Sequence, residues 1–452
     1  MFVDTICAPA TGLVHSSIAV IRVSGPETLR AVSAIFSRPE KLEPRTAAYG
    51  SIRDAGEIVD DVIAIYFKAP ASFTGEDMAE ISCHGNPVIV NRILALLIRH
   101  GARIAGPGEF SKRAFLHGKI DLTAAEAINH IVKARGDWEI QAAIRQMHGS
   151  LKNLVAKIRN ELIGLKADIE CGIDFSEEGI EFISGEQAIQ KVEELITGIE
   201  DMMRRCRIGG RLSGGIDVPI VGKPNVGKSS ILNLLLNAER AIVSNLPGTT
   251  RDMIRESVRI AGIEINLFDT AGIDTTECAI ELKGIEFSRR KIESSPLIII
   301  VLDATTGIRD ADRAIMEHAA GKRTIYLVNK TDLAGEEESA RIIASLDVPE
   351  AIAFSACTGA GLAAFENMIS SLLLDEFADT RDAFVADTRI IALLESALVK
   401  ARGTIDLLVH SEPPEIIAFS IQEILDEMGE ITGEISPDEV LNSIFSRFCI
   451  GK

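Results

Sequence analysis

The chain has 452 residues, which at about 150 residues per domain predicts roughly three domains. Hydrophobic residues make up 46% and charged residues 25%, a globular composition that excludes a fibrous or wholly disordered protein. With 47 Lys and Arg against 66 Asp and Glu, the net charge is −19, so the chain as a whole repels nucleic-acid phosphates. Any nucleic-acid partner must therefore meet a local basic patch or another subunit.

Cysteine usage and the amino terminus indicate the compartment. The seven cysteines are scattered and contain no CxxC pair, which predicts neither a disulfide framework nor a zinc site. The amino terminus lacks the basic stretch and apolar core of a secretory signal. The longest apolar run, Leu297 to Leu302, is far too short to span a membrane. We therefore expect a cytoplasmic protein with no membrane partner.

The first part of the chain alternates strand-like and helical patterns. Three short runs rich in β-branched and apolar residues predict strands: Ser17–Val23, Asp61–Phe67 and Met78–Cys83. Asn86 followed by Pro87 predicts the start of a helix, and Gly101 predicts its end. We expect an α+β domain over residues 1–119.

The next segment, 120–215, has a helical pattern. Apolar residues recur at spacings of three and four from Ile140 to Ile169, which predicts one long amphipathic helix packed in a bundle, with a coiled-coil dimer seam as the alternative. Four glycines near its end predict a flexible linker into a new domain: Gly209, Gly210, Gly214 and Gly215.

The region 216–376 has the pattern of an α/β domain. Five apolar runs separated by helical segments predict a mostly parallel, doubly wound sheet: Val218–Val221, Ile265–Phe268, Leu297–Leu302, Thr324–Val328 and Ala351–Phe354. Helical signals return over 377–452, where Ser436 to Glu439 predict a capping box. We therefore expect the α/β domain to be inserted into an all-α domain made of two segments.

A phosphate-binding motif follows the first strand of this α/β domain. Gly222 to Ser229 reads GKPNVGKS and matches GxxxxGK[ST] between a predicted strand and a predicted helix. Glycines let backbone amides face phosphate oxygens at the helix amino terminus. Lys228 is expected to reach the terminal phosphates, and Ser229 to ligate magnesium.

Three further segments in the right order predict a guanine nucleotide. Asp269–Gly272 is a DxxG, whose aspartate holds magnesium through water and whose glycine amide senses the γ-phosphate. Asn329–Asp332 is an NKxD, whose aspartate accepts two hydrogen bonds that guanine offers and adenine does not. Ser355 and Ala356 follow a further predicted strand and are suited to contacting the guanine base. A switch segment, Gly248–Asp252, supplies a threonine that orders the loop around the γ-phosphate.

The residue after DxxG is Ile273, where many GTPases carry a water-orienting glutamine. An isoleucine cannot orient water. Hydrolysis therefore needs another water-positioning group and another source of positive charge, a role in which an arginine finger is worth about 10³ to 10⁵ in rate.

Beyond these motifs, the chain resembles the MnmE (TrmE) family of tRNA-modification GTPases along nearly its whole length. The matching segments are IRVSG (Ile21–Gly25), SFTGEDMAE (Ser72–Glu80), His84 with Gly85, Pro107–Asp121, the GTPase motifs, EITGE (Glu430–Glu434) and FCIGK (Phe448–Lys452). The resemblance implies a tetrahydrofolate-binding and dimerisation domain at 1–119, a helical domain at 120–215 and 377–452, and a Ras-like P-loop GTPase domain at 216–376. It also implies a homodimer that works with the FAD-dependent MnmG (GidA) subunit on tRNA.

The resemblance also assigns site residues. It places potassium, which supplies the missing charge, on Asn225, Ser244, the Leu246 carbonyl and Thr249, and it places magnesium on Ser229 and Thr250. The water-orienting group falls on Glu281, with Asn225, Lys228 and Thr250 completing the catalytic set; without the family, a solvated carboxylate at a helix start would be favoured for Glu281. The expected GTP and GDP contacts are Asn225, Val226, Gly227, Lys228, Ser229, Ser230, Ser244, Asn245, Leu246, Pro247, Gly248, Thr249, Thr250, Asp269, Thr270, Ala271, Gly272, Asn329, Lys330, Thr331, Asp332, Ser355, Ala356 and Cys357.

The family's folate site, for a 5-formyl- or 5,10-methylene-tetrahydrofolate, falls on four charged residues: Arg22, Glu80, Lys119 and Lys452. A basic group suits the glutamyl carboxylates, and a carboxylate suits the two donors of the pterin ring. Cys449 is next to Ile450 in the same segment and could serve as a nucleophile, but this role is disfavoured because no partner base can be identified. The arginines from Arg204 to Arg211 are a tRNA-contact candidate, although a solvated helix end is favoured.

Two functions are compatible with these residues. The first is potassium-stimulated GTP hydrolysis that drives motion in a complex adding a (carboxymethyl)aminomethyl group to C5 of a tRNA wobble uridine, with a one-carbon unit from tetrahydrofolate. The alternative is a GTP-switched RNA or ribosome assembly factor without folate chemistry, since related GTPases share PNVGKS and GTTRD. The amino-terminal domain and FCIGK discriminate in favour of the first.

Overall fold

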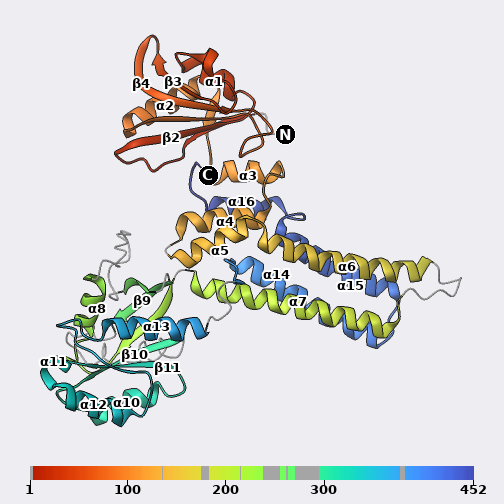
Figure 1. The fold of residues 1–452 in the computed structure, drawn as a ribbon. Helices are drawn as coiled ribbons and strands as arrows, with labels where there is room; N and C mark the ends of the chain where they lie inside the picture. The colour runs from red at the N-terminus through yellow and green to blue at the C-terminus, as the bar shows by residue number, and fades with distance from the viewer. Residues whose placement is uncertain are drawn as a thin grey trace, which may run out of the picture. The chain divides into compact units, whose positions relative to one another are not determined.

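The computed structural model describes residues 4–134, 136–174, 183–213, 215–237, 255–260, 263–269, 295–376 and 382–451 (Figure 1). The chain divides into two compact units. Unit 1 comprises Met1–Val132, Ile144–Glu200 and Ala392–Lys452, and unit 2 comprises Lys133–Ala143 and Asp201–Ile391. Most of unit 2 is therefore one continuous stretch of chain that interrupts unit 1.

Unit 1 begins with a twisted sheet in the order β3-β4-β5-β2-β1-β6. Its strands are β1 (Thr5–Pro9), β2 (Ser16–Ser24), β3 (Ala47–Asp54), β4 (Glu57–Phe67), β5 (Met78–Gly85) and β6 (Ala102–Ile104). Neighbouring strands are antiparallel except β1 and β6, which are parallel. The three strands predicted from the sequence are confirmed as β2, β4 and β5.

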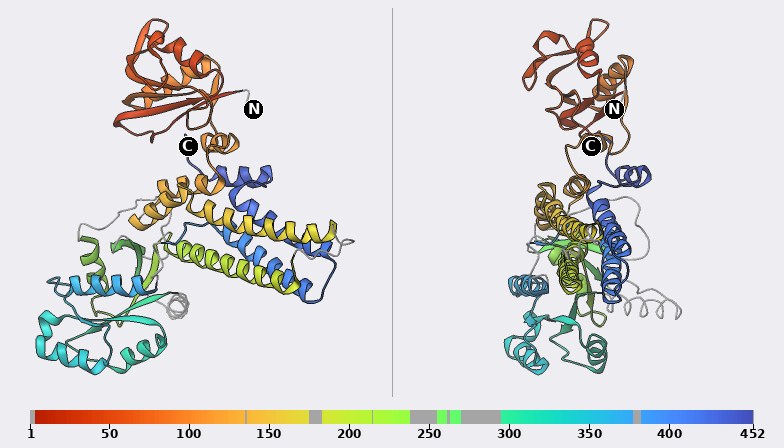
Figure 2. Two further views of the ribbon diagram at one scale, coloured as in Figure 1. Left: turned by 45° about the vertical axis from the view of Figure 1, so that its right-hand side comes forward. Right: turned by 90° about the vertical axis from the view of Figure 1, so that its right-hand side faces the viewer.

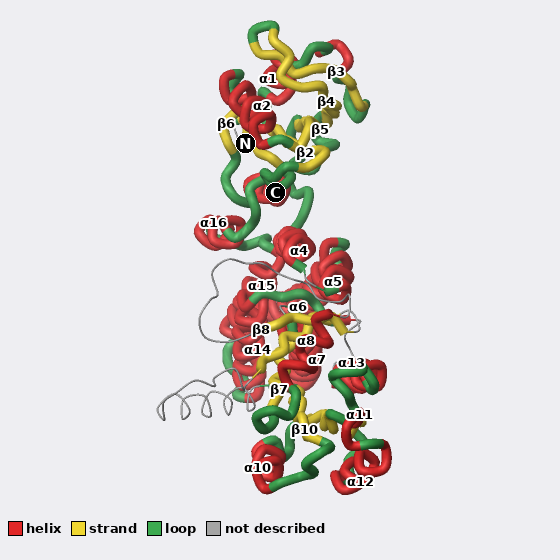
Figure 3. Tube along the Cα trace, turned by 90° about the vertical axis from the view of Figure 1, so that its left-hand side faces the viewer, coloured by secondary structure: helices red, strands yellow, loops and turns green. Residues whose placement is uncertain are grey.

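Two helices bury one face of this sheet, α1 (Thr28–Ile35) and α2 (Pro87–Arg99). Figure 3 shows both helices beside the strands. Their apolar side chains, among them Val32 and Ile93, share a core with Ile21 and Ile81 of the sheet. The Asn86 side chain accepts a hydrogen bond from the Val88 amide, and Pro87 occupies the first turn, so the predicted helix start is confirmed.

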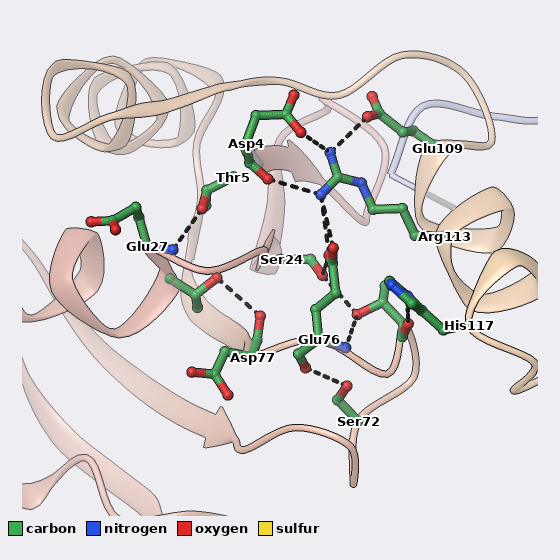
Figure 4. A network of polar contacts seen from close by, with 12 residues as sticks. Asp4, Thr5, Ser24, Glu27, Ser72, Glu76, Asp77, Glu109, Arg113 and His117 are labelled. Carbon is green, nitrogen blue, oxygen red and sulfur yellow. Dashed lines mark hydrogen bonds and ion pairs between the residues drawn. The ribbon is translucent and has the colours of Figure 1, made fainter. Parts of the chain in front are cut away.

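A fully buried arginine on α3 (Glu109–Leu116) joins this helix to the sheet. Arg113 donates to the Asp4 carbonyl and carboxylate at 2.9 and 2.8 Å, to Glu76 Oε2 at 3.1 Å and to Glu109 Oε1 at 3.0 Å (Figure 4). Ser24 in turn donates to Glu76 at 2.8 Å. A buried charge is tolerated only when it is paired in this way, so α3, β1 and the loop before β5 are held together by one cation.

The remaining helices of the two helical segments are α4 (Leu122–Lys133), α5 (Asp137–Met147), α6 (Ser150–Asp174), α7 (Gly185–Leu212), α14 (Thr388–Val409), α15 (Pro414–Thr432) and α16 (Asp438–Ser446). Although they are distant in sequence, α6 and α15 pack side by side, and Lys166 donates to Gln422 at 2.8 Å between them (Figure 2). The buried stripe on α6 includes Leu151, Ile158 and Leu165. A helix-packing role for the apolar stripe is thus confirmed for its α6 part.

Three details of the helical prediction are wrong. The predicted single helix is broken between α5 and α6 at Gly149, whose φ of +93° cannot continue a helix. Gly209 and Gly210 lie inside α7 rather than in a linker. Position 209 needs a glycine for packing, because a Cβ there would lie 1.7 Å from the Phe384 carbonyl oxygen. At α16 the N-cap is Pro437, which makes no side-chain cap, so the capping box at Ser436 does not form.

Unit 2 is built on a second sheet, in the order β12-β11-β10-β7-β9-β8. Its strands are β7 (Ile216–Val221), β8 (Arg255–Ile260), β9 (Ile263–Asp269), β10 (Leu297–Asp303), β11 (Arg323–Asn329) and β12 (Ala351–Ala353). All neighbours are parallel except β8 and β9. The mostly parallel sheet is therefore confirmed, and the antiparallel edge strand β8 was not predicted.

Helices cover both faces of this sheet, as a doubly wound fold requires. α8 (Lys228–Asn237) and α13 (Leu362–Glu376) share a core with Ile299 and Val301. α10 (Asp310–His318) and α12 (Glu336–Leu346) share another with Ile298 and Ile300 (Figure 1). Alternate residues of β10 thus enter opposite cores, which explains why this strand is a continuous apolar run.

Within the part of the chain that the structure describes, no helix has the length and apolar character that a membrane crossing requires.

The adjacent glycines of α7 provide a test of the close approach to Phe384. We expect Gly209→Ala to lower the free energy of unfolding by about 1 to 3 kcal/mol, because the new methyl group would overlap the Phe384 carbonyl. Gly210→Ala is the matched control: its nearest contact would be 3.7 Å, and alanine in a helix stabilises by about 0.5 to 1 kcal/mol. Calorimetric melting of both variants checks this. Equal melting temperatures would contradict the packing assignment.

The Arg113 cluster predicts an acid sensitivity. Burial alone would raise the pKa of Glu109, but hydrogen bonds from Arg103, the Gly106 amide and Arg113 lower that pKa from 4.5 to about 2. A depressed pKa stabilises the folded state above pH 4.5, and this stabilisation is lost as the pH falls toward 2. We expect the melting temperature of the wild type to fall more steeply over this range than that of Glu109→Gln. Glu57→Gln, at an exposed ion pair with Arg92, should follow the wild type.

Candidate functional site

The loop between β7 and α8 passes very close to two other strands. A Cβ at Gly222 would lie 2.6 Å from the Val301 carbonyl oxygen, and one at Gly227 would lie 2.2 Å from Asn329 Nδ2. Only glycine therefore lets the loop adopt this course. The side chain of Lys228 is almost fully buried, and its Nζ donates to the carbonyls of Gly222 and Lys223 at 2.7 and 2.8 Å. The loop thus curves around its own lysine.

The NKxD segment follows β11 and contacts the phosphate loop directly. Asn329 Nδ2 donates to the Val226 carbonyl at 2.8 Å, and Asn329 Oδ1 accepts from the Ala356 amide at 3.0 Å. Ser355 Oγ donates to Asp332 Oδ1 at 2.7 Å, which orients that carboxylate. The structure therefore joins the NKxD segment to the phosphate loop, 103 residues before it, and to Ala356, 27 residues after it. Parallel strands with a common carboxyl edge place such segments together.

A carboxylate that sequence analysis missed completes this edge. Asp303 is the last residue of β10, and it pairs with Lys330 at 2.7 Å. Burial would raise the pKa of Asp303, but hydrogen bonds from Lys330 and Thr305 hold it below its ordinary value. The sequence could have indicated this residue, because Asp303 directly follows the predicted apolar run Leu297–Leu302. A polar residue at the carboxyl end of a parallel strand lies at the same sheet edge as the phosphate loop.

A second missed pair links the phosphate loop to α10. Lys223 Nζ lies 2.5 Å from Asp312 Oδ2, and the Asp312 side chain is 1% exposed. The same oxygen accepts from the Arg309 amide at the start of α10. Its sequence signal was weak, because an aspartate in the first turn of a helix is ordinarily a solvated group.

Other predicted nucleotide contacts are described only in part. Ser229 and Ser230 lie in the exposed first turn of α8, and the exposed Cys357 follows Ala356. The backbone of Asp269 pairs with Ile220 at the carboxyl end of β9, beside the phosphate loop. Thr331, which is described, donates its hydroxyl to the Phe354 carbonyl at 2.9 Å. Several predicted site residues lie outside the described residues: Ser244, Asn245, Leu246, Pro247, Gly248, Thr249, Thr250, Thr270, Ala271, Gly272 and the catalytic candidate Glu281.

Part of the predicted folate set comes together in unit 1. Arg22 and Glu80 face each other on β2 and β5 and form an ion pair of 2.9 Å, with both side chains about a quarter exposed at 27% and 28%. Arg22 also donates to the Gly451 carbonyl at 3.5 Å. Lys119 instead donates to the Pro70 carbonyl at 2.9 Å. Lys452 lies outside the described residues.

The carboxyl-terminal segment packs tightly beside this pair. Ile450 forms a backbone bridge with Pro107, and a Cβ at Gly451 would lie 2.1 Å from the Pro9 carbonyl oxygen. The thiol-bearing Cys449 is exposed. The FCIGK end therefore reaches the amino-terminal sheet because a glycine lets it approach β1.

The arginines predicted near the end of α7 are part of the helix surface. Arg204 and Arg205 both pair with Asp201, at 2.6 and 2.7 Å. The Asp201 carboxylate thus forms ion pairs with two of the four arginines, as is common on a solvated helix surface.

Comparisons with known proteins agree with these observations. Residues 5–119 match the family described as GTP-binding protein TrmE N-terminus, and residues 122–449 match the MnmE helical domain. A tRNA modification GTPase MnmE of Listeria innocua is 38% identical over 454 residues, with 99% of each chain covered. Proteins of the same name from Thermotoga maritima and Aquifex aeolicus are 37% and 38% identical, with 99% of this chain and 100% of theirs covered. The chain therefore belongs to the MnmE family of tRNA modification GTPases.

Proposed function

We propose that this chain uses potassium-stimulated GTP hydrolysis to drive motion in a complex that modifies the wobble uridine of tRNA. In this proposal a (carboxymethyl)aminomethyl group is added to C5 of the uridine, with a one-carbon unit from tetrahydrofolate. The partners are a second copy of the chain, an FAD-dependent MnmG subunit and the tRNA. The observation that carries the proposal is that Asn329 joins the phosphate loop to the base-binding segments in one assembled site.

Guanine recognition is assigned to the oriented carboxylate of Asp332. Because Ser355 already occupies one lone pair of Oδ1, the remaining acceptors of the carboxylate are free for the ring and exocyclic nitrogens of guanine. Adenine offers no matching pair of donors. The backbone amides of the glycine-rich loop are proposed to donate to phosphate oxygens at the start of α8, and Ser229 with Thr250 would hold magnesium.

The catalytic step needs a group that replaces the absent glutamine, since Ile273 follows DxxG. Glu281 is proposed to orient the attacking water as a hydrogen-bond acceptor. Potassium held by Asn225, Ser244, the Leu246 carbonyl and Thr249 would supply positive charge at the leaving oxygens. Asn225 is an exposed residue of the phosphate loop with a positive φ of 64°.

The folate site is proposed around Arg22 and Glu80, with Lys119 and Lys452 as further cations. A carboxylate that is both salt-bridged and partly exposed can accept two donors from a pterin ring while its arginine stays in place. The carbonyl of Gly451 beside Arg22 links the carboxyl terminus to the same site. Binding of a reduced folate at this site would distinguish a tRNA-modifying GTPase from an RNA or ribosome assembly factor that lacks folate chemistry.

The role of Glu281 predicts a selective loss of turnover. We expect Glu281→Ala to lower kcat for GTP by about 10² or more while GTP affinity stays within twofold, because a water-orienting group acts in the transition state. Steady-state hydrolysis in potassium, with binding of a fluorescent GTP analogue, measures both. Glu277→Ala, four residues earlier, is the control and should match the wild type. Wild-type turnover by Glu281→Ala, or equal wild-type rates in sodium and potassium, would contradict this part of the proposal.

The folate assignment predicts a linked loss of ligand binding and tRNA modification. We expect Arg22→Met to weaken 5-formyl-tetrahydrofolate binding by tenfold or more, because a charge-assisted bond to the ligand is lost. In a strain lacking the gene, we expect the wobble-uridine modification to disappear and to return with the wild-type gene but not with Arg22→Met.

The control for this prediction is Arg53→Met, which removes an exposed arginine from β3 of the same sheet. It should bind folate and restore modification normally. Unchanged wobble uridine in the deletion strain would contradict the proposed function as a whole.

A further inference from the structure

We propose that Asp303 is a positioning residue for guanine-nucleotide retention, acting through Lys330 on the phosphate loop. This inference rests on the proposed GTP site and extends it to a residue outside its sequence motifs. Asp303 ends β10 and Lys330 directly follows β11, so their pairing is a product of the fold.

The register of the sheet places Asp303 where it can act. β10 and β11 are parallel neighbours with Asp303 opposite Asn329, so Lys330 is the next residue along. Both oxygens of the Asp303 carboxylate are engaged. Oδ1 accepts from the Thr305 amide at 2.9 Å and from Thr305 Oγ1 at 2.6 Å, and Oδ2 accepts from Lys330 Nζ at 2.7 Å. The carboxylate is therefore rigidly oriented toward the lysine.

Lys330 transmits this orientation to the phosphate loop. Its Nζ donates to the Asn225 carbonyl at 2.7 Å, the same distance as to Asp303. Asn225 and Lys330 both have positive φ, of 64° and 67°. Asparagine adopts this conformation readily, whereas a lysine holds it only when surrounding contacts impose it. The ammonium between Asp303 and the Asn225 carbonyl is such a contact.

Loss of the Asp303 charge would leave Lys330 with one strong partner instead of two. The side chain of Asp303 is 9% exposed and that of Lys330 is 30% exposed, so water replaces the lost bond incompletely. The NKxD backbone and the peptide at Asn225 would then lose their common anchor, and bound nucleotide would leave more readily. Asn225 is also a proposed potassium ligand, so hydrolysis of bound GTP should change as well. That change should be far smaller than the change in release, because the bond to Lys330 is made by the Asn225 carbonyl and not by its side chain.

The variant Asp303→Asn isolates this bond. Asparagine can keep its oxygen on Thr305 and presents a neutral amide to Lys330, so only the ion pair is removed. We expect release of a fluorescent GDP analogue, followed by stopped flow on the full chain, to accelerate by about 10- to 100-fold. Single-turnover hydrolysis of pre-bound GTP should stay within threefold. Glu338→Gln, at an exposed ion pair with Arg341 in the same unit, is the control and should release GDP at the wild-type rate.

A double-substitution cycle separates positioning from a general structural role. Lys330→Met alone should accelerate release to a similar extent, and Asp303→Asn should add less than twofold in the Lys330→Met background. Asp303→Glu, which keeps the charge, should release GDP at a rate between those of the wild type and Asp303→Asn, and it carries the test if Asp303→Asn does not fold. A full tenfold effect of Asp303→Asn on top of Lys330→Met, or wild-type release by Asp303→Asn, would overturn the proposal. If the wild type itself bound no guanine nucleotide, the proposed function would fail instead.

Discussion

The proposed nucleotide site depends on the side chain of Asn329, which donates to the Val226 carbonyl and accepts from the Ala356 amide. These two bonds join the phosphate loop, the end of β11 and the loop after β12. The glycine at 227 exists because Asn329 occupies the space that a Cβ would need. Lys330 and Asp303 then repeat the same linkage one residue further along. A phosphate loop and a base-binding loop that are bonded to each other in this way cannot move independently.

A comparable constraint organises the amino-terminal sheet, where the group that joins the segments is a buried cation. Arg113 is fully buried among three carboxylates, so its charge is balanced inside the protein rather than by water. The helix that carries it leads on to Lys119, and Gly108 just before it accepts close contact from the Phe445 carbonyl. The amino-terminal sheet and the carboxyl-terminal segment are thereby held near the same point, where Arg22 meets Gly451.

The parts predicted well are those where local pattern and environment agree. A parallel strand buried on both faces is apolar throughout, so β10 and its neighbours could be recognised, and Asn86 with Pro87 marks a helix start by local hydrogen bonding alone. The predictions that failed concern choices made by distant contacts. Gly209 was predicted to be a linker residue, but the structure shows that glycine is needed there for the close approach of Phe384. Ser436 was predicted to cap a helix, but the helix begins one residue later, with Pro437 as its N-cap. The edge strand β8 has too little apolar character on its own to be distinguished from a loop.

The motifs proposed to bind phosphate and guanine, the isoleucine in place of glutamine at position 273 and the family could all be recognised without the structure. These features depend only on the types of residues and on their short spacings along the chain, and both are independent of the fold. Which charges act together, in contrast, follows from the fold. The pairs Asp303 with Lys330, Lys223 with Asp312 and Arg113 with Glu76 join residues that lie between 27 and 89 positions apart. They form because strand register and helix packing remove these groups from water, so that each charge must find its partner across the fold.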